Sequence, residues 1–409
     1  MKHVNTVIIG GGQAGLAMGR CLFEHGIDYV ILERGRIGER WHSERWDSLK
    51  LLTPNWQSRL PHGAYDGGEP DAFMSVPDFI ERLERYARSY DACIERGTTV
   101  TAVQRMEGRK FRVATDRGEW CARNVVVATG FCDTPRVPDF AENLPDDVVQ
   151  IVPPEYRNPS QVPEGHVLVV GASATGLQIA EELLGAGRSV TVSVGTHIRV
   201  PRRYRGRDIL YWMDATGGFA AAADPADERG NPPPQLVGSA ENRDLDLSTV
   251  QKLGARLAGR TAGVEDGRVL FADTLRQSVE KADRMMFELL GKIDGFIEAK
   301  GYDAPPAEAG EVQPVPIPDA PAELPVGTGG VRAVVWATGY QRKYPWLKIP
   351  VLDERGEISH KEGISPVAGL YVLGMRFQKR KYSNLIDGVG RDAEDLAGYI
   401  AKRTRAIAA

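Results

Sequence analysis

The sequence predicts an α/β fold built from two domains that each contain a parallel sheet, because one pattern occurs twice. In both copies a short apolar run leads into a glycine-rich loop, a segment with helical spacing and a second apolar run. The copies begin near residues 4 and 166 of the 409. A strand, a crossover helix and a parallel strand form this kind of unit. A chain of this length is also expected to divide into two or three domains.

The first copy, residues 4–33, has each part of a βαβ motif that binds a dinucleotide. Gly10 would make the tight turn, Gly12 would let the backbone approach a pyrophosphate, and Gly15 would allow the helix to pack on the strand. The acid at the end of the second strand, Glu33, stands where a carboxylate accepts hydrogen bonds from a ribose hydroxyl. A glycine-rich turn in an unrelated α/β domain is the alternative. The residues expected to bind this first cofactor are Gly10, Gly12, Gln13, Ala14, Gly15, Glu33 and Arg34.

The second copy, residues 166–194, repeats the plan with one change in the loop. Ser173 replaces the middle glycine, and a residue this small still permits a phosphate to approach the backbone. Two Rossmann-like units indicate two dinucleotides, and we therefore expect a flavoenzyme that takes a hydride from a nicotinamide. The expected ligands in this loop are Gly171, Ser173, Ala174, Thr175 and Gly176.

The second copy ends without an acid, and this predicts which nicotinamide binds. Val194 stands at the offset of Glu33, and an arginine-rich stretch follows over 199–207. A carboxylate would repel a 2′-phosphate, whereas a guanidinium binds it with two hydrogen bonds. We therefore predict NADPH rather than NADH, with Arg199 and Arg202 as the phosphate ligands. The alternative is a solvated basic loop, which would account for several of these arginines.

Two further apolar runs, 125–130 and 334–339, both end in Ala-Thr-Gly. Small residues at the end of a strand let the chain leave the sheet beside a bound cofactor. The order of loops and runs predicts that the second nucleotide domain is inserted into the first. The predicted FAD-binding domain covers 1–160 and 331–409, and the NADPH-binding domain covers 161–330, with an irregular and helical insertion at about 213–330. The cofactor ligands expected in the two runs are Ala128, Thr129, Gly130, Ala337, Thr338 and Gly339.

Composition argues against several other classes of protein. A net charge of −4 gives no overall field that would attract nucleic acid or an anionic membrane. There is no run of about 18 apolar residues and no secretory leader, so a cytoplasmic protein without a membrane span is expected. The four cysteines are dispersed and form no Cys-x-x-Cys pair, which argues against a disulfide set, a metal site and a thioredoxin-reductase-like enzyme.

Together these motifs resemble the class B flavin monooxygenases, which include flavin-containing monooxygenases, YUCCA-type indole-pyruvate monooxygenases and Baeyer–Villiger monooxygenases. Within that group the motifs are most similar to those of CzcO-like bacterial flavoproteins. The resemblance rests on the two loops, on both Ala-Thr-Gly runs, on Arg40-Trp41 and on the stretches 47–51 and 156–159. It covers almost the whole chain except about 213–330.

The resemblance implies places for further residues near the cofactors. In this family the segment after the first acid wraps the flavin ring, which puts Arg40 and Trp41 beside FAD. Asn55 matches a stretch in which an asparagine lies near the flavin, and it is the candidate catalytic residue; a turn residue after a proline is the alternative. Val103 corresponds to a residue that contacts the adenine, and Asp387 lies at the start of the last helix, which faces the flavin.

The resemblance also implies the reaction. An FAD- and NADPH-dependent monooxygenase would use molecular oxygen to insert one oxygen atom into a small organic substrate through a C4a-(hydro)peroxyflavin. An amine, a sulfide, a 2-oxo acid or a ketone would be a suitable substrate. One departure matters, because Val152 stands where the family has a histidine associated with monooxygenation. An NAD(P)H-dependent flavin oxidoreductase or oxidase is therefore the first alternative, and a flavin-binding redox sensor is the second. The sequence leaves open whether the chain forms a homodimer.

Overall fold

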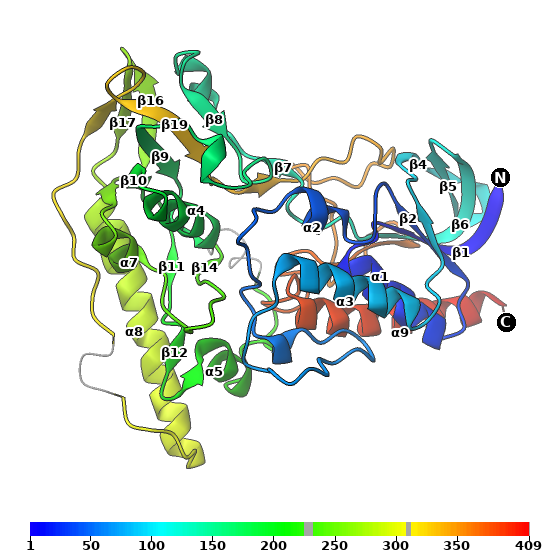
Figure 1. Ribbon diagram of the computed structural model, residues 1–409. Helices are drawn as coiled ribbons and strands as arrows, with labels where there is room; N and C mark the ends of the chain where they lie inside the picture. The colour runs from blue at the N-terminus through cyan, green and yellow to red at the C-terminus, as the bar shows by residue number, and fades with distance from the viewer. Residues whose placement is uncertain (225–231, 308–311, 409) are drawn as a thin grey trace.

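The computed structural model describes residues 1–224, 232–307 and 312–408, and these fold into two lobes that lie side by side (Figure 1). One lobe holds both chain termini, and the other is built from the middle of the chain. Each lobe has a sheet with parallel strands and helices packed against it. The predicted α/β fold class is confirmed.

The first sheet has the strand order β3-β2-β1-β6-β5-β4, and β21 pairs with β6. The neighbours on the β3-β2-β1-β6 side run parallel, as does β21, whereas β4, β5 and β6 are antiparallel neighbours. The strands are β1 Lys2–Ile9, β2 Tyr29–Glu33, β3 Ile94–Arg96, β4 Val100–Met106, β5 Lys110–Thr115, β6 Gly118–Val127 and β21 Leu370–Val372.

Both faces of this sheet are covered, which explains why its parallel strands are apolar along their length. Ile8, Ile31 and Val126 point into a core that they share with α1, α3 and α9. Val7 and Val125 point the other way, into a core that includes side chains of the segment 344–358. The helices of this lobe are α1 Gln13–Glu24, α2 Glu39–Ser43, α3 Val76–Arg88 and α9 Ile386–Ala408, with short 3-10 turns η1 Asn55–Gln57 and η2 Glu107–Arg109.

The second sheet is parallel throughout and has the order β15-β10-β9-β19-β8. Its strands alternate in the same way, so that Val169 and Val192 share a core with α4, α7 and the start of α8. The strands are β8 Val149–Ile151, β9 His166–Val170, β10 Ser189–Ser193, β15 Arg256–Ala258 and β19 Val331–Trp336. The helices are α4 Ala174–Gly185, α5 Ile209–Ala215, α7 Leu247–Lys252 and α8 Leu275–Lys300, with 3-10 turns η3 Asp139–Asn143 and η4 Pro159–Gln161.

The predicted insertion contributes the long helix α8 and several short strands. The apolar stripe in the sequence, which includes Val279, Met286 and Ile293, is buried as expected for an amphipathic helix. Within this insertion, residues 225–231 and 308–311 lie outside the described residues. The short strands inside the insertion are β14 Pro234–Gln235, β16 Thr261–Glu265, β17 Arg268–Phe271 and β18 Glu323–Pro325. Three more precede it: β11 Ile198–Arg199, β12 Arg203–Tyr204 and β13 Arg207–Asp208.

The chain crosses between the lobes twice, and the two crossings pair with each other. The first leaves the end of β6 and forms β7 Thr134–Pro135, and the second leaves the end of β19 and forms β20 Tyr340–Gln341. These strands form an antiparallel pair that lies between the lobes (Figure 1). Strands β8 and β19 belong to the second sheet by their pairing. The predicted boundaries at 160/161 and 330/331 therefore each separate one strand from the sheet to which it belongs.

Candidate functional site

The first glycine loop is closed by contacts that only glycine permits. A Cβ atom on Gly10, whose φ is +108°, would lie 2.6 Å from the carbonyl oxygen of Ala128. A Cβ atom on Gly15 would lie 1.9 Å from the carbonyl oxygen of Gly10. Gly12 is different, because no atom lies within 4 Å of the place where its Cβ would be. Gly10 and Gly15 thus allow the loop to pack closely, and Gly12 leaves open space at the N-terminus of α1.

The second loop repeats this construction. A Cβ atom on Gly171 would lie 2.3 Å from the carbonyl oxygen of Ala337, and one on Gly176 would lie 2.0 Å from the carbonyl oxygen of Gly171. Ser173 precedes α4 with φ −85° and ψ −179°, whereas Gly12 precedes α1 with φ −85° and ψ −170°. Any residue adopts this extended backbone, so serine replaces glycine here without strain.

Both helices begin with free N–H groups, which is the feature that fits a pyrophosphate. Neither Gly12 nor Ser173 caps its helix with a side-chain hydrogen bond. The first N–H groups of a helix have no partner within the helix, and they carry the positive end of its dipole. The N–H groups at these two helix starts can therefore bind an anionic group of a dinucleotide. Of the other predicted loop residues, Gln13 and Ala14 form the first turn of α1, and Ala174 and Thr175 form that of α4.

The two Ala-Thr-Gly turns lie against these loops, as the glycine contacts with Ala128 and Ala337 show. Thr129 and Gly130 follow the first contact, and Gly130 has a φ of +77°. In the second turn the hydroxyl of Thr338 donates to the carbonyl oxygen of Arg136, and Gly339 has a φ of +88°. Each turn therefore joins a nucleotide loop to one of the crossings between the lobes.

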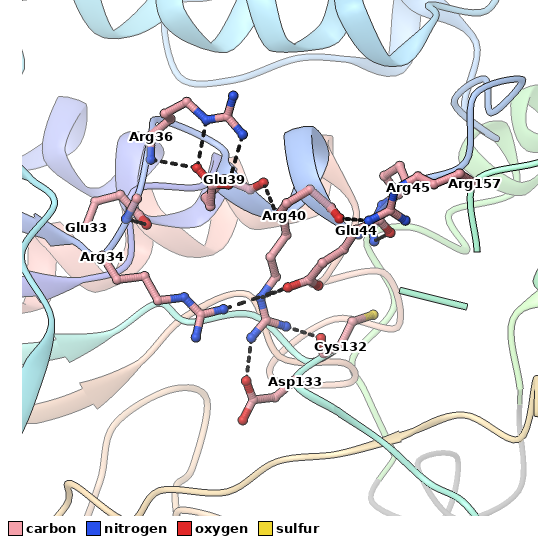
Figure 2. A network of polar contacts seen from close by, with 12 residues as sticks. Glu33, Arg34, Arg36, Glu39, Arg40, Glu44, Arg45, Cys132, Asp133 and Arg157 are labelled. Carbon is pink, nitrogen blue, oxygen red and sulfur yellow. Dashed lines mark hydrogen bonds and ion pairs between the residues drawn. The ribbon is translucent and has the colours of Figure 1, made fainter. Parts of the chain in front are cut away.

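Glu33 lies at the end of β2 with its carboxylate turned toward the first loop. Its two oxygens accept hydrogen bonds from the backbone N–H groups of Gly11, at 2.6 Å, and Gly35, at 2.8 Å. A carboxylate oxygen has two lone pairs, so each can also accept a hydrogen bond from a ribose hydroxyl. The guanidinium of Arg34 is half exposed and lies 3.8 Å from Glu44 (Figure 2).

Arg40 ties the segment after β2 to the first crossing between the lobes (Figure 2). From α2 its guanidinium donates to the carboxylate of Asp133 and to the carbonyl oxygen of Cys132. Burial raises the pKa of the Cys132 thiol, so this thiol is a poor nucleophile at neutral pH. Trp41 lies edge-on to Phe79, with ring centroids 4.8 Å apart, and so anchors α2 on α3.

Asn55 belongs to a short buried segment of polar residues. Its Nδ2 donates to the carbonyl oxygen of Glu69 at 2.9 Å, while its Oδ1 has no partner among the described residues. In the same part of the chain, Gln57 Oε1 and Ser58 Oγ are buried and likewise unpaired. A buried acceptor without a partner costs about 1–3 kcal/mol, so three of them together fit a segment that faces a bound group. Sequence reasoning missed Gln57 and Ser58, because polar residues after a proline are typical of exposed turns.

Val103 and Asp387 both have partners inside the protein, and these contacts count against their predicted roles at the cofactor. The N–H of Val103 donates to Trp346 O at 2.8 Å, its carbonyl accepts from Lys348 N at 2.9 Å, and its side chain is fully buried. Both backbone polar groups of Val103 are therefore already hydrogen-bonded within the protein. The carboxylate of Asp387 binds Arg59 at 2.8 and 3.1 Å and also Arg391 at 3.0 Å. It therefore holds two arginines at the start of α9.

Arg199 and Arg202 are both held in ion pairs inside the protein, and these pairs count against the prediction that the two arginines bind a 2′-phosphate. Arg199 is 7% exposed and pairs with Asp246 at 2.7 Å and Asp283 at 2.6 Å. Arg202 is 1% exposed, hydrogen-bonds to the carboxylate of Asp208 and donates to the carbonyl oxygen of Leu52 at 2.9 Å. Moving either guanidinium to a ligand would leave a buried carboxylate unpaired, which is strongly unfavourable.

Val152, which replaces the family histidine, is partly buried in an apolar cluster with the second sheet. Its carbonyl accepts the N–H groups of Glu155 and Tyr156, which forms a turn. Tyr156 is fully buried and donates its hydroxyl to Glu182 on α4 at 2.7 Å. The aromatic residue of the fingerprint therefore braces α4, while the position of the histidine carries no polar side chain.

A groove of about 650 Å³ lies where the segment 46–50 passes α4 and α7. It is lined by Trp46, Lys50, Glu181 and other residues, and none of the predicted cofactor ligands takes part. Over residues 1–224, 232–307 and 312–408, no three His, Cys, Asp or Glu side chains are grouped so that they could hold a metal ion. No helix within those ranges is long and apolar enough to span a membrane.

Comparison with known proteins agrees with this geometry. A family model described as pyridine nucleotide-disulphide oxidoreductase matches residues 7–213. An oxidoreductase named CzcO-like from Geobacillus kaustophilus is 34% identical over 406 residues, which cover 98% of this chain and 99% of that protein. The probable indole-3-pyruvate monooxygenase YUCCA3 of Arabidopsis thaliana is 31% identical over 219 residues. This match covers 49% of this chain and 48% of the YUCCA3 sequence.

Among solved structures, the flavin-containing monooxygenase of Stenotrophomonas maltophilia has a similar fold. The match has a TM-score of 0.68 at 19% identity and covers 99% of this chain and all of the other. The family model spans half of the sequence, and the CzcO-like relative is similar from end to end. The chain has the fold of a flavin-containing monooxygenase; it belongs to the pyridine nucleotide-disulphide oxidoreductase family and is an oxidoreductase related to the CzcO-like proteins.

Proposed function

We propose that this protein is a cytoplasmic FAD- and NADPH-dependent monooxygenase that inserts one oxygen atom into a small organic substrate. The observation that carries the proposal is the repeated loop geometry, in which Gly12 and Ser173 precede their helices with nearly identical backbone angles. Two such helix starts in one chain provide for two dinucleotides. The names of the relatives, which mention a pyridine nucleotide and a flavin, support a nicotinamide and FAD as the pair.

In this proposal the first lobe holds FAD. The N–H groups at the start of α1 would stabilise the pyrophosphate, and Glu33 would accept hydrogen bonds from a ribose hydroxyl. Arg40 would hold the flavin-wrapping segment in place through Asp133. When bound, FAD supplies the redox chemistry, because it accepts a hydride and reacts with oxygen.

The buried acceptors of the segment 55–58 would act at the reacting end of the cofactor. Asn55 Oδ1, Gln57 Oε1 and Ser58 Oγ are shielded from water and have no partner among the described residues. Such groups can orient a donor N–H or O–H of cofactor or substrate in a site that excludes water. Asn55 remains the proposed catalytic residue on this ground.

The second lobe would hold NADPH. The start of α4 offers the same free N–H groups for its pyrophosphate, and Ser173 leaves them uncapped. At the end of β10 the buried side chain of Val194 takes the place of an acid. No carboxylate at this position would then repel a 2′-phosphate.

A second candidate function is an NAD(P)H-dependent flavin oxidase or oxidoreductase that inserts no oxygen. Val152 favours it, because an apolar side chain in the cluster with the second sheet cannot donate or accept a proton. Both functions need the two nucleotide sites, so they differ only after the flavin is reduced.

One experiment separates the two functions. The full-length protein is loaded with FAD, reduced by NADPH without oxygen, and then mixed with labelled oxygen and one of a panel of amines, sulfides and 2-oxo acids. Labelled product together with less than one hydrogen peroxide per NADPH supports the monooxygenase. One peroxide per NADPH with every compound supports the oxidase. If neither NADPH nor NADH reduces the flavin, both functions are excluded.

A further inference from the structure

The ends of β2 and β10 can be matched residue by residue, because the two βαβ units share their hydrogen bonds. Gly10 N donates to Leu32 O at 2.9 Å, and Gly171 N donates to Ser193 O at 3.0 Å. Leu32 and Ser193 therefore hold the same place in their units. The next residue is Glu33 in the first lobe, and its counterpart in the second is Val194.

The strand beside each of these ends can be matched in the same way. Leu32 pairs with Glu95 of β3, and Ser193 pairs with Ala258 of β15, in parallel register in both cases. Two residues further along, the first lobe has Gly97 and the second has Arg260. The carboxyl ends of neighbouring parallel strands lie at one edge of a sheet, where a dinucleotide binds.

The two lobes therefore differ in charge at these matched positions. In the first lobe an acid, Glu33, is matched with the glycine at 97, and in the second an apolar residue, Val194, is matched with an arginine at 260. An acid accepts hydrogen bonds from the two hydroxyls of an unmodified ribose. An arginine without a neighbouring acid suits a ribose that carries a phosphate.

The backbone around Arg260 is fixed on both sides. Its N–H donates to Thr274 Oγ1 at 3.1 Å, and its carbonyl accepts from Ala272 N at 2.9 Å. Ser193 Oγ donates to Gly259 O and accepts from Thr261 N, both at 3.0 Å. This seryl side chain joins the residues that flank Arg260 to the end of β10, so the guanidinium starts from a fixed point beside the predicted nucleotide edge.

The side chain of Arg260 is exposed and has no ion-pair partner among the described residues. The arginines of the basic stretch 199–207, in contrast, have partners within the protein. Besides the buried Arg199 and Arg202, Arg203 Nη2 donates to Gly206 O at 2.6 Å, and Arg205 pairs with Asp294 at 2.7 Å. Arg207 lies over the ring of Tyr211, at 5.1 Å from its centroid. Arg260 is thus available to a ligand.

We propose that Arg260 binds the 2′-phosphate of NADPH and selects this nucleotide over NADH. The inference rests on the proposed NADPH site of the second lobe and assigns its specificity to a residue outside the basic stretch 199–207. The guanidinium can form two parallel hydrogen bonds with a phosphate, and Val194 leaves no carboxylate to oppose it.

Calorimetric titration of the full-length protein with adenosine 2′,5′-bisphosphate and with adenosine 5′-monophosphate tests this without turnover. The wild type should bind the bisphosphate more tightly. Arg260→Ala should weaken bisphosphate binding by roughly 10- to 100-fold and leave monophosphate binding unchanged, because one charge-assisted contact is lost. Arg260→Lys should retain part of the preference, since an ammonium binds phosphate without the two-pronged geometry.

Arg256→Ala is the matched control, because Arg256 is also exposed but begins the same strand, β15, away from its carboxyl end. This variant should bind both nucleotides as the wild type does. If Arg260→Ala keeps the full preference while both nucleotides bind, the assignment of Arg260 is wrong and the NADPH site stands. Equal binding of the two nucleotides by the wild type also overturns the assignment. If the wild type binds neither, the proposed nucleotide site itself is wrong.

Discussion

Arg40 donates a hydrogen bond to Asp133 where the chain first leaves the first sheet for the second lobe. The two side chains are 19% and 28% exposed, so water screens this pair only in part. Through this pair the segment that follows β2 is fixed to the first of the two crossings between the lobes (Figure 2). The pair thus connects the proposed FAD site with the joint between the lobes.

Loss of this pair should loosen both the joint and the flavin. We expect Arg40→Ala to lower the free energy of unfolding by about 1–3 kcal/mol, because the Asp133 carboxylate loses a charged, partly buried partner. The variant should also lose FAD during gel filtration, measured as the ratio of flavin to protein absorbance. Arg36→Ala is the control: Arg36 is 59% exposed, and it holds the pKa of Glu39 at about 2 by a hydrogen bond. An equal loss of flavin from both variants would show that Arg40 has no special role.

The loop glycines should divide into two classes. Gly10→Ala and Gly171→Ala should prevent stable folding of their lobes, because the added Cβ would lie 2.6 and 2.3 Å from a backbone oxygen. Gly12→Ala should fold normally, since open space surrounds its Cβ position, but it should bind FAD less tightly. Circular dichroism and flavin content measure the two effects. A Gly12→Ala protein with full flavin content would contradict the proposed position of the pyrophosphate.

Removal of the Arg199 side chain should act on stability and not on nucleotide choice. Arg199→Ala leaves Asp246 and Asp283 buried without their partner, which should cost about 3–5 kcal/mol of unfolding free energy. Chemical denaturation measures this loss, and Arg203→Ala, at an exposed site of the same stretch, should cost less than about 1 kcal/mol. A loss of preference for the 2′-phosphate in folded Arg199→Ala would restore the assignment made from sequence.

Stability should fall as the pH drops below 6.5. Burial lowers the folded-state pKa of His166, His197 and His360 from an ordinary value of 6.5. In the interval below 6.5 the unfolded chain binds more protons than the folded one, so acidification favours unfolding until the folded-state pKa is also passed. Each histidine can add at most about 1.4 kcal/mol per pH unit to this slope.

His197 offers the clearest test of this pH dependence, because it is 4% exposed. Denaturation curves for the wild type and for His197→Gln between pH 7.5 and pH 5.5 measure its share. The variant should show the shallower slope, because the proton that His197 takes up only on unfolding is then missing. Equal slopes for the wild type and His197→Gln would mean that His197 takes up its proton in the folded state as readily as in the unfolded one.

Features set by neighbours in sequence were predictable. The place of Ser173 in the second loop and the buried stripe of α8 both follow from local spacing, since a helix or tight turn is formed by residues close in the chain. The domain limits were harder, because β8 and β19 join the second sheet by pairing with strands that lie far away in sequence. A strand of three residues such as β8 is too short for its sequence pattern to indicate which sheet it joins.

By itself, the sequence determined that this protein contains two βαβ units with open helix starts, because glycines and apolar runs act within about 30 residues. Only the tertiary structure decided which charged residues are free to meet a ligand. The partners of Arg199 come from 47 and 84 residues away in the chain. The arginine that occupies the carboxylate of Asp387 is Arg59, 328 residues away. In sequence Arg199 and Arg260 look alike, because each is simply a charged residue after a strand. Whether an acid neutralises the guanidinium depends on residues that only the whole fold brings near.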